Sequence, residues 1–168
     1  MPLPRHDLTR EEVLAHLAYD PETGTFTRTS TRGRCDRWKK GQQAGSPVKG
    51  AYVQIWLLGR LYQAHRLAWL VEHGVWPSKH IDHINGDRHD NRISNLRECD
   101  DKLNMENIRR PHKDNSLGVL GVKRHGSRFL ARIYVDGKEQ SLGSFDTPEE
   151  AHVAYIEAKR KLHAGCTI

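Results

Sequence analysis

The sequence lacks three features, and each absence excludes a class of protein. Its 168 residues contain no run near the roughly 18 apolar residues of a membrane-spanning helix, so we expect no membrane partner. The first residues, MPLPRHDLTREEVL, lack the apolar segment of a secretory signal, which favours a cytoplasmic protein. The three cysteines, Cys35, Cys99 and Cys166, form no CxxC pair, so neither a cysteine-built zinc site nor a disulfide framework is expected.

Acidic residues are scarce in one stretch. From residue 28 to residue 60 the chain has eight Lys or Arg and one acid, Asp36, so this stretch carries +7 in a chain whose net charge is +6. Such a local excess suits a polyanion, because each neutralised phosphate releases condensed counterions. A solvated loop is the alternative explanation. We call five cations of this stretch the basic arm and expect them to contact phosphates: Arg32, Arg34, Arg37, Lys39 and Lys40.

In the first half of the chain, local patterns predict short helices and strands. Thr9 and Glu12 have the spacing of a capping box, which predicts a short helix. The segment AYVQIWLLGRLYQ predicts two strands that turn at Gly59, followed by a helix over residues 64–73 that Gly74 ends. HIDHI and ISNLREC predict two further strands. Asp100 or Asp101 then caps a helix to about residue 110, which Pro111 stops.

The second half predicts a small sheet and one helix. Residues 111–117 have no periodic pattern and predict a linker. Three strands are expected, with Asp136-Gly137 as the second turn: residues 118–125, 128–135 and 139–145. A final amphipathic helix is expected after residue 146. Its cap is Thr147, its first residue is Pro148, and Glu150 completes the capping box. Together these elements predict an α+β fold.

Polar residues in the HIDHINGDRHDNRISNLRECDDKLN stretch have a spacing that favours a catalytic site. Asp82 and His83 are adjacent, Asn95 follows His83 by twelve residues, and Asn104 follows Asn95 by nine. If the predicted helix crosses the predicted hairpin, Asp82 and Asn104 can offer oxygen to one hard cation, Mg²⁺ or Mn²⁺. A neutral imidazole at His83 can then take a proton from water near neutral pH.

Taken singly, each of these residues has an ordinary structural explanation. His83 alone is a structural or surface histidine, and Asn95 and Asn104 alone are turn and helix-end residues. Asp82 alone pairs with an arginine such as Arg88 or Arg92. Their joint spacing is what favours a shared site.

The pattern HRLAW…IDHINGDRHDNRISNLR…N, over roughly residues 50–110, resembles the HNH endonucleases, in particular the homing and free-standing nucleases common in phages. The resemblance implies that His83 is the general base and that Asn95 orients the catalytic hairpin and His83. It implies that Asp82 and Asn104 hold the metal. DNase colicins carry a further histidine where this chain has Ile108, so two protein ligands and an Mg²⁺-type ion are implied rather than zinc. His65 is then either near the site or simply packed on the hairpin, and packing is favoured.

The last 50 residues resemble a second family. The region between about residues 118 and 165 resembles the AP2 domain of plant transcription factors and phage HNH nucleases. Four short sequence motifs carry the resemblance: GV, FLARI, LGSF and TPEEAHVAY. The resemblance implies a three-stranded sheet that enters the DNA major groove. Two groups of residues are implied to contact DNA: Lys123, His125, Arg132, Tyr134 and Ser141 on the sheet, and Arg124 and Arg128 at phosphates. Ser141 replaces a contacting tryptophan of the plant proteins, and the alternative is that this module only packs on the nuclease core.

We therefore expect four regions in the chain. They are an N-terminal part (residues 1–63), a nuclease core with a ββα metal site (64–110), a linker (111–117) and an AP2-like DNA-binding domain (118–168). The expected function is divalent-metal-dependent cleavage of double-stranded DNA at a specific site, in a bacterial or phage-infected cytoplasm. One site per chain favours a monomer that nicks one strand, whereas a double-strand break needs a dimer or a second encounter with the DNA. The alternative is a non-catalytic DNA-binding regulator with a degenerate nuclease fold.

Overall fold

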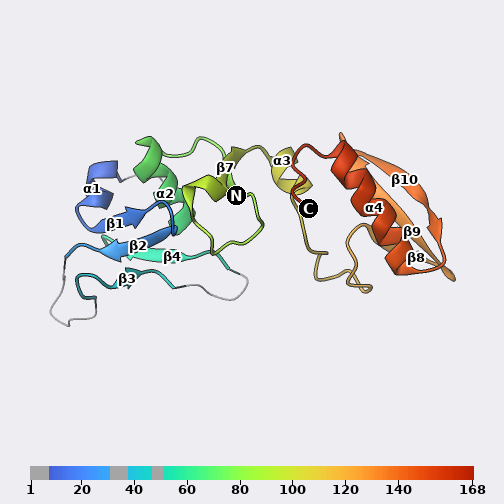
Figure 1. Cartoon of the computed structure of the whole chain (residues 1–168), viewed down its shortest axis with the longest axis horizontal. Coiled ribbons are helices and arrows are strands. Elements are labelled where there is room, and N and C mark those ends of the chain that lie inside the picture. Colours follow the sequence, from blue (N-terminus) through green and yellow to red (C-terminus); the bar gives the residue numbers. More distant parts are fainter. Residues whose placement is uncertain (1–7, 31–37, 47–50) are drawn as a thin grey trace. The chain divides into compact units, whose positions relative to one another are not determined.

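The computed structural model describes residues 8–30, 38–46 and 51–168, and the chain divides into two compact units, Met1–Cys99 and Asp100–Ile168 (Figure 1). Three residues of the predicted basic arm, Arg32, Arg34 and Arg37, lie outside the described residues. Within the described part, no helix has the length and apolar character needed to cross a membrane. The predicted boundaries after residues 63, 110 and 117 stay predictions.

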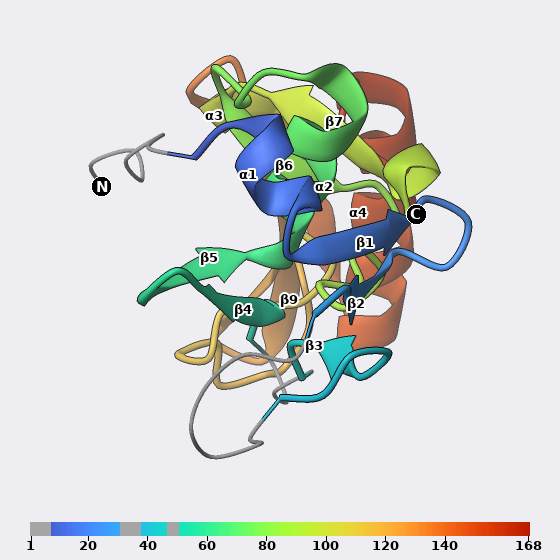
Figure 2. The same ribbon diagram turned by 90° about the vertical axis from the view of Figure 1, so that its left-hand side faces the viewer.

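The first unit combines two short helices with small antiparallel sheets. Strands β1, β2 and β3 form one sheet, while β4–β5 and β6–β7 form separate hairpins. Helix α1 packs on β1 and α2 (Figure 2), and Val13, Leu17 and Leu67 are fully buried there. The elements are α1 (Arg10–Leu14), β1 (Leu17–Asp20), β2 (Thr25–Arg28), β3 (Gln43–Ala44), β4 (Gln54–Leu57), β5 (Arg60–Gln63), α2 (Ala64–His73), β6 (His80–His83), the 3₁₀ turn η1 (Ile93–Asn95) and β7 (Leu96–Cys99).

Two helix predictions in this unit are confirmed by their end residues. Thr9 caps α1, because its hydroxyl accepts the Glu12 N–H while the Glu12 carboxylate accepts the Thr9 N–H at 2.8 Å. Helix α2 has the predicted bounds and ends at Gly74, whose φ of 74° is left-handed and suits glycine.

The second unit is a three-stranded antiparallel sheet, in the order β8–β9–β10, with α4 packed on one face (Figure 1). The predicted capping box of α4 is confirmed, and so is the turn at Asp136-Gly137, where both residues have positive φ (50° and 76°). The predicted first strand is shorter than expected, because Gly118 and Gly121 take left-handed conformations before it. The elements are α3 (Asp101–Glu106), β8 (Val122–His125), β9 (Arg128–Val135), β10 (Lys138–Phe145) and α4 (Pro148–Leu162).

The segment around the predicted site differs from expectation in two places. The predicted second strand of the hairpin begins with η1, so Asn95 lies at the end of a 3₁₀ turn and not in a strand. Helix α3 ends at Glu106 rather than near residue 110. The chain leaves the helix there because residues 165–167 bind its end: Gly165 donates to the Glu106 carboxylate, and the Thr167 hydroxyl donates to Asn107.

Helix α2 carries a buried, uncharged histidine. His65 is 4% exposed, and its Nδ1 has no hydrogen-bond partner among the described residues. Burial lowers the pKa of His65 to about 3, and the positive charges of His83 and Arg66 act in the same direction. In the unfolded chain His65 binds a proton as the pH falls below its ordinary pKa of 6.5. In the folded state it stays neutral until the pH is much lower.

We predict that replacing His65 with glutamine flattens the pH dependence of stability. The pKa of His65 is lower in the folded state, so its contribution is present above pH 6.5 and is lost as pH falls toward about 3. Within that window, the exclusion of one proton from the folded protein lowers the free energy of unfolding by about 1.4 kcal/mol for each pH unit of acidification. Denaturant unfolding across this pH range should show a shallower loss of the free energy of unfolding in His65→Gln. Parallel curves for the two proteins would contradict the assignment.

Candidate active site

The β6–β7 hairpin brings Asp82 and His83 into the interior of the first unit. In its register Asp82 is opposite Arg97 and His83 is opposite Leu96. Consecutive strand residues point to opposite faces, and here both faces are covered, since Asp82 is 8% and His83 4% exposed. The His83 ring is therefore almost enclosed.

The carboxylate of Asp82 forms an ion pair across the hairpin. Its Oδ2 accepts hydrogen bonds from Arg97 Nε at 3.0 Å and Arg97 Nη2 at 2.8 Å. The alternative reading of the sequence proposed Arg88 or Arg92 as the partner, but the partner is Arg97, and Arg92 pairs with Asp90 at 2.6 Å. Arg97 thus fixes Oδ2.

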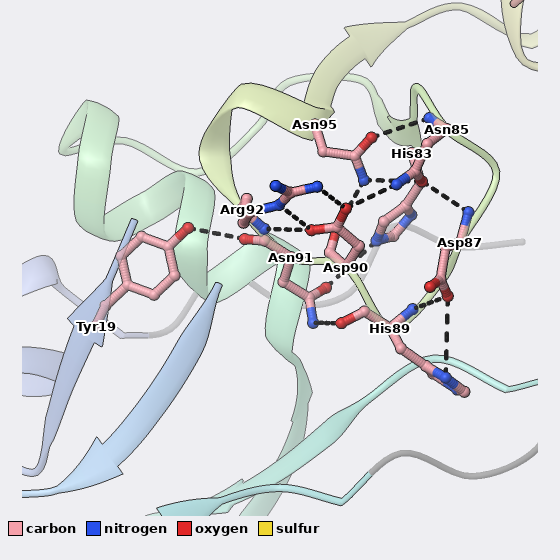
Figure 3. A network of polar contacts seen from close by, with 9 residues as sticks. All are labelled: Tyr19, His83, Asn85, Asp87, His89, Asp90, Asn91, Arg92 and Asn95. Carbon is pink, nitrogen blue, oxygen red and sulfur yellow. Dashed lines mark hydrogen bonds and ion pairs between the residues drawn. The ribbon is translucent and has the colours of Figure 1, made fainter. Parts of the chain in front are cut away.

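His83 is hydrogen-bonded to Asn91, a residue of the loop between β6 and η1 (Figure 3). Its Nε2 lies 3.3 Å from Oδ1 of Asn91, which is 2% exposed. The Asn91 amide can point only one way, because its Nδ2 donates to the carbonyl of His89 at 3.1 Å. A carbonyl oxygen cannot donate, so His83 Nε2 carries the proton and Nδ1 holds the lone pair.

The surroundings of His83 keep its ring neutral near pH 7. Burial lowers the pKa of His83, and the Asn91 hydrogen bond and nearby carboxylates such as Asp82 only partly oppose this effect. The His65 ring meets the His83 ring edge-on at 5.1 Å between centroids, and the Tyr52 ring lies 5.8 Å away. His65 therefore packs on the hairpin, and it does so directly against His83. A neutral imidazole is the form that accepts a proton.

Asn95 fixes the loop between the two strands. Its Oδ1 accepts the N–H of Asn85 at 2.9 Å, and its Nδ2 donates to Asn85 Oδ1 at 3.0 Å and to the Asp90 carbonyl at 2.8 Å. The Asp90 carboxylate in turn accepts from Asn85 and Arg92 (Figure 3). The contact to the imidazole comes from Asn91, so the orienting role predicted for Asn95 stays a prediction while its bracing of the loop is observed.

The metal ligands predicted from the sequence lie in different units. Asp82 is in β6, and Asn104 is an exposed residue of α3, in the second unit, so their joint role stays a prediction. No group of three or more His, Cys, Asp and Glu side chains in the described ranges could hold a metal ion. A site of one carboxylate and one amide needs no such group. The oxygen donors of an aspartate and an asparagine suit a hard cation.

The predicted DNA-facing residues of the second unit alternate along the strands. Val122, Ala131 and Ile133 are buried, and Val122 and Ala131 belong to the apolar cluster under α4. Alternation therefore puts the following predicted residues on the opposite, open face: Lys123, His125, Arg128, Arg132, Tyr134 and Ser141. Arg124 is exposed but follows Lys123, so it points to the other side. Of the basic arm, Lys39 and Lys40 are described, and both are exposed.

One acidic residue on the open face was missed by the sequence argument. Glu139 Oε2 accepts from Arg132 Nη1 at 2.8 Å and from the Tyr134 hydroxyl at 2.6 Å. The carboxylate thus holds two of the predicted DNA-contacting side chains in fixed positions. The strand register pairs Glu139 directly with Tyr134, but nothing in the sequence indicates that one oxygen serves both neighbours.

Comparison with known proteins identifies one segment of the chain. No curated protein and no solved structure matches the chain. Residues 62–106 match a family model described as HNH endonuclease. The matched segment runs from the end of β5 to the end of α3 and includes Asp82, His83, Asn91, Asn95 and Asn104. At the level of the family, this match supports a nuclease, a hydrolase of phosphodiester bonds, with DNA as its substrate.

Proposed function

We propose that the protein is a divalent-metal-dependent endonuclease of the HNH type that nicks duplex DNA at a specific site, with His83 as general base. The observation that carries the proposal is the state of His83 within the matched segment. Its Nε2 donates to Asn91 and burial lowers its pKa, so a neutral ring offers its lone pair at Nδ1. These are the properties that a base needs to deprotonate water near neutral pH.

In the proposed reaction, Nδ1 of His83 takes a proton from a water molecule that attacks the phosphorus in line with the departing 3′ oxygen. Only 4% of His83 is exposed, so this water has to be an ordered molecule in the site rather than one from open solvent. The hydrogen bond to Asn91 keeps the second proton on Nε2 and becomes stronger when the ring gains charge.

Asp82 and Asn104 are the proposed ligands of the cation, Mg²⁺ or Mn²⁺. A bound divalent ion would offset negative charge on the phosphate and the leaving oxygen. Arg97 holds Asp82 Oδ2 and so restricts the rotation of the carboxylate that would bind the ion. Asn104 would supply an amide oxygen from α3.

DNA binding is proposed for two surfaces. The basic arm would contact phosphates without regard to sequence, because its charges meet a uniform backbone. The open face of the β8–β10 sheet would supply base contacts in the manner of an AP2 domain, since it presents Arg132 and Tyr134 in positions fixed by Glu139. We place this activity in a bacterial or phage-infected cytoplasm, with one chain per nick.

A non-catalytic DNA-binding regulator is the second candidate. It is favoured by two features of the first unit, the near-complete enclosure of His83 and the neutralisation of the Asp82 carboxylate by Arg97. Both candidates predict DNA binding, and only the nuclease predicts cleavage.

We predict that His83→Ala abolishes nicking of supercoiled plasmid in Mg²⁺ or Mn²⁺. Loss of a general base typically costs about 10²- to 10⁴-fold in rate. The matched control is His80→Ala, which removes an exposed histidine from the same strand and should keep the wild-type rate. Unchanged nicking by His83→Ala would exclude His83 as the base. Failure of the wild-type protein to nick with any divalent ion would favour the regulator.

A double-mutant cycle tests whether Asp82 and Asn104 serve one cation. Asp82→Asn and Asn104→Ala should each weaken Mn²⁺ binding, measured by calorimetry, by roughly tenfold or more, and the double variant should lose little beyond the worse single one. Asp101→Asn, an exposed carboxylate of α3, is the control and should bind Mn²⁺ normally. Fully additive losses would argue against a shared ion.

The two DNA-binding surfaces should differ in their response to salt. Joint replacement of the basic arm by glutamine should weaken binding to all DNA sequences and reduce the slope of log K against log salt by about 0.9 for each lost phosphate contact. Arg132→Gln should instead reduce discrimination between DNA sequences. Binding measured against several duplexes over a salt series separates the two effects, and an unchanged slope in the arm variant would eliminate the arm as a phosphate-binding element.

A further inference from the structure

The β1–β2 hairpin reaches the active-site loop from outside the segment that matches the HNH family. Tyr19, on β1, donates its hydroxyl to the backbone carbonyl of Asn91 at 2.8 Å (Figure 3). The Tyr19 ring is held by the Phe26 ring on β2, at 4.8 Å between centroids. The residue that bonds to His83 is therefore fixed at its backbone by a strand more than 70 residues earlier in the sequence.

The turn of the same hairpin touches the same backbone. Gly24 has a φ of 70°, and a Cβ added there would lie 2.5 Å from the carbonyl carbon of Asn91 and 2.4 Å from the backbone nitrogen of Arg92. Any side chain at this position would therefore displace the Asn91–Arg92 peptide. Gly24 and Tyr19 thus restrain Asn91 by two independent contacts, one steric and one a hydrogen bond.

The position of the Asn91 backbone decides whether its side chain reaches His83. The Asn91 Oδ1 to His83 Nε2 distance is 3.3 Å, already long for a hydrogen bond, so a backbone shift of a few tenths of an ångström would break it. Without this acceptor, the Asn91 side chain no longer favours the Nε2–H tautomer of His83 over the Nδ1–H tautomer. The lone pair would then be divided between the two nitrogens.

We infer that Tyr19 and Gly24 are positioning residues for His83, which act through Asn91 to keep the imidazole lone pair on Nδ1. The catalytic consequence rests on the proposed function, whereas the effect on the ring does not. Burial and the Glu72 carboxylate raise the pKa of the Tyr19 hydroxyl, so it stays a donor over the working pH range. The conservative replacement Tyr19→Phe removes this donor and keeps the ring that packs on Phe26.

The test reads the His83 tautomer directly. Long-range ¹H–¹⁵N spectra of the full-length protein near neutral pH should show the Nε2–H form of His83 in the wild type and a larger Nδ1–H fraction in Tyr19→Phe. The same variant should nick roughly tenfold to a hundredfold more slowly, as expected for a misplaced catalytic group, with an unchanged DNA dissociation constant. Tyr62→Phe, a tyrosine of β5 that stacks on Trp76, is the matched control and should change neither quantity.

A double-mutant cycle shows whether the effect passes through Asn91. Asn91→Ala should reproduce the tautomer change, and adding Tyr19→Phe to it should cause little further change. Gly24→Ala should shift the tautomer in the same direction through steric displacement. If that variant does not fold, Tyr19→Phe still decides the question.

Two outcomes would overturn the inference. One is an unchanged His83 tautomer in Tyr19→Phe, and the other is a tautomer change that adds fully to that of Asn91→Ala. A wild-type protein that does not nick DNA would refute the proposed function, while the tautomer measurement would still decide the positioning role of Tyr19.

Discussion

The proposed chemistry of the site depends on one interaction, the hydrogen bond between Asn91 Oδ1 and His83 Nε2. A buried imidazole has two nitrogens with opposite roles, and its neighbours select which one keeps the proton. Asn91 makes this selection because its own amide is fixed by the His89 carbonyl and its backbone by Tyr19. Each contact is ordinary in strength, but together they fix the position of the one side chain that bonds to His83.

Burial of so many polar groups is possible only because they satisfy one another. Desolvating an unpaired amide or carboxylate costs several kcal/mol, whereas a fully paired one costs little. Asn95 uses both ends of its amide on the loop, and Asp82 is paired with Arg97. His65 is one exception, since its buried Nδ1 has no partner in the described part of the chain. That histidine lies against His83, and burial lowers the pKa of both rings.

Local patterns in the sequence predicted the helices with strong caps and the turns with positive φ, because those signals are contained within a few residues. The joint spacing of Asp82, His83, Asn95 and Asn104 predicted the HNH segment for a similar reason, since the motif is nearly contiguous. The roles of Asn91, Arg97 and Glu139 were missed. Each of these roles depends on which side chains face one another across a hairpin or loop. The residue types alone do not specify this pairing. Asn91 in particular looks like any turn-forming asparagine. Only its contact with a distant strand distinguishes it.

The segment defined by family similarity and the units defined by packing do not coincide. Residues 62–106 match the HNH family, whereas the division between the units falls at Cys99, before α3. A helix of six residues is too short to be stable by itself, so α3 needs neighbours. It finds them in the second unit, where Gly165 donates to Glu106 and fits so closely that an added Cβ would lie 2.5 Å from the Leu103 carbonyl oxygen. Asn104, a proposed metal ligand on this helix, therefore depends for its local structure on residues some 60 positions later. The segment that matches the family model thus includes an element whose packing partners lie outside that segment.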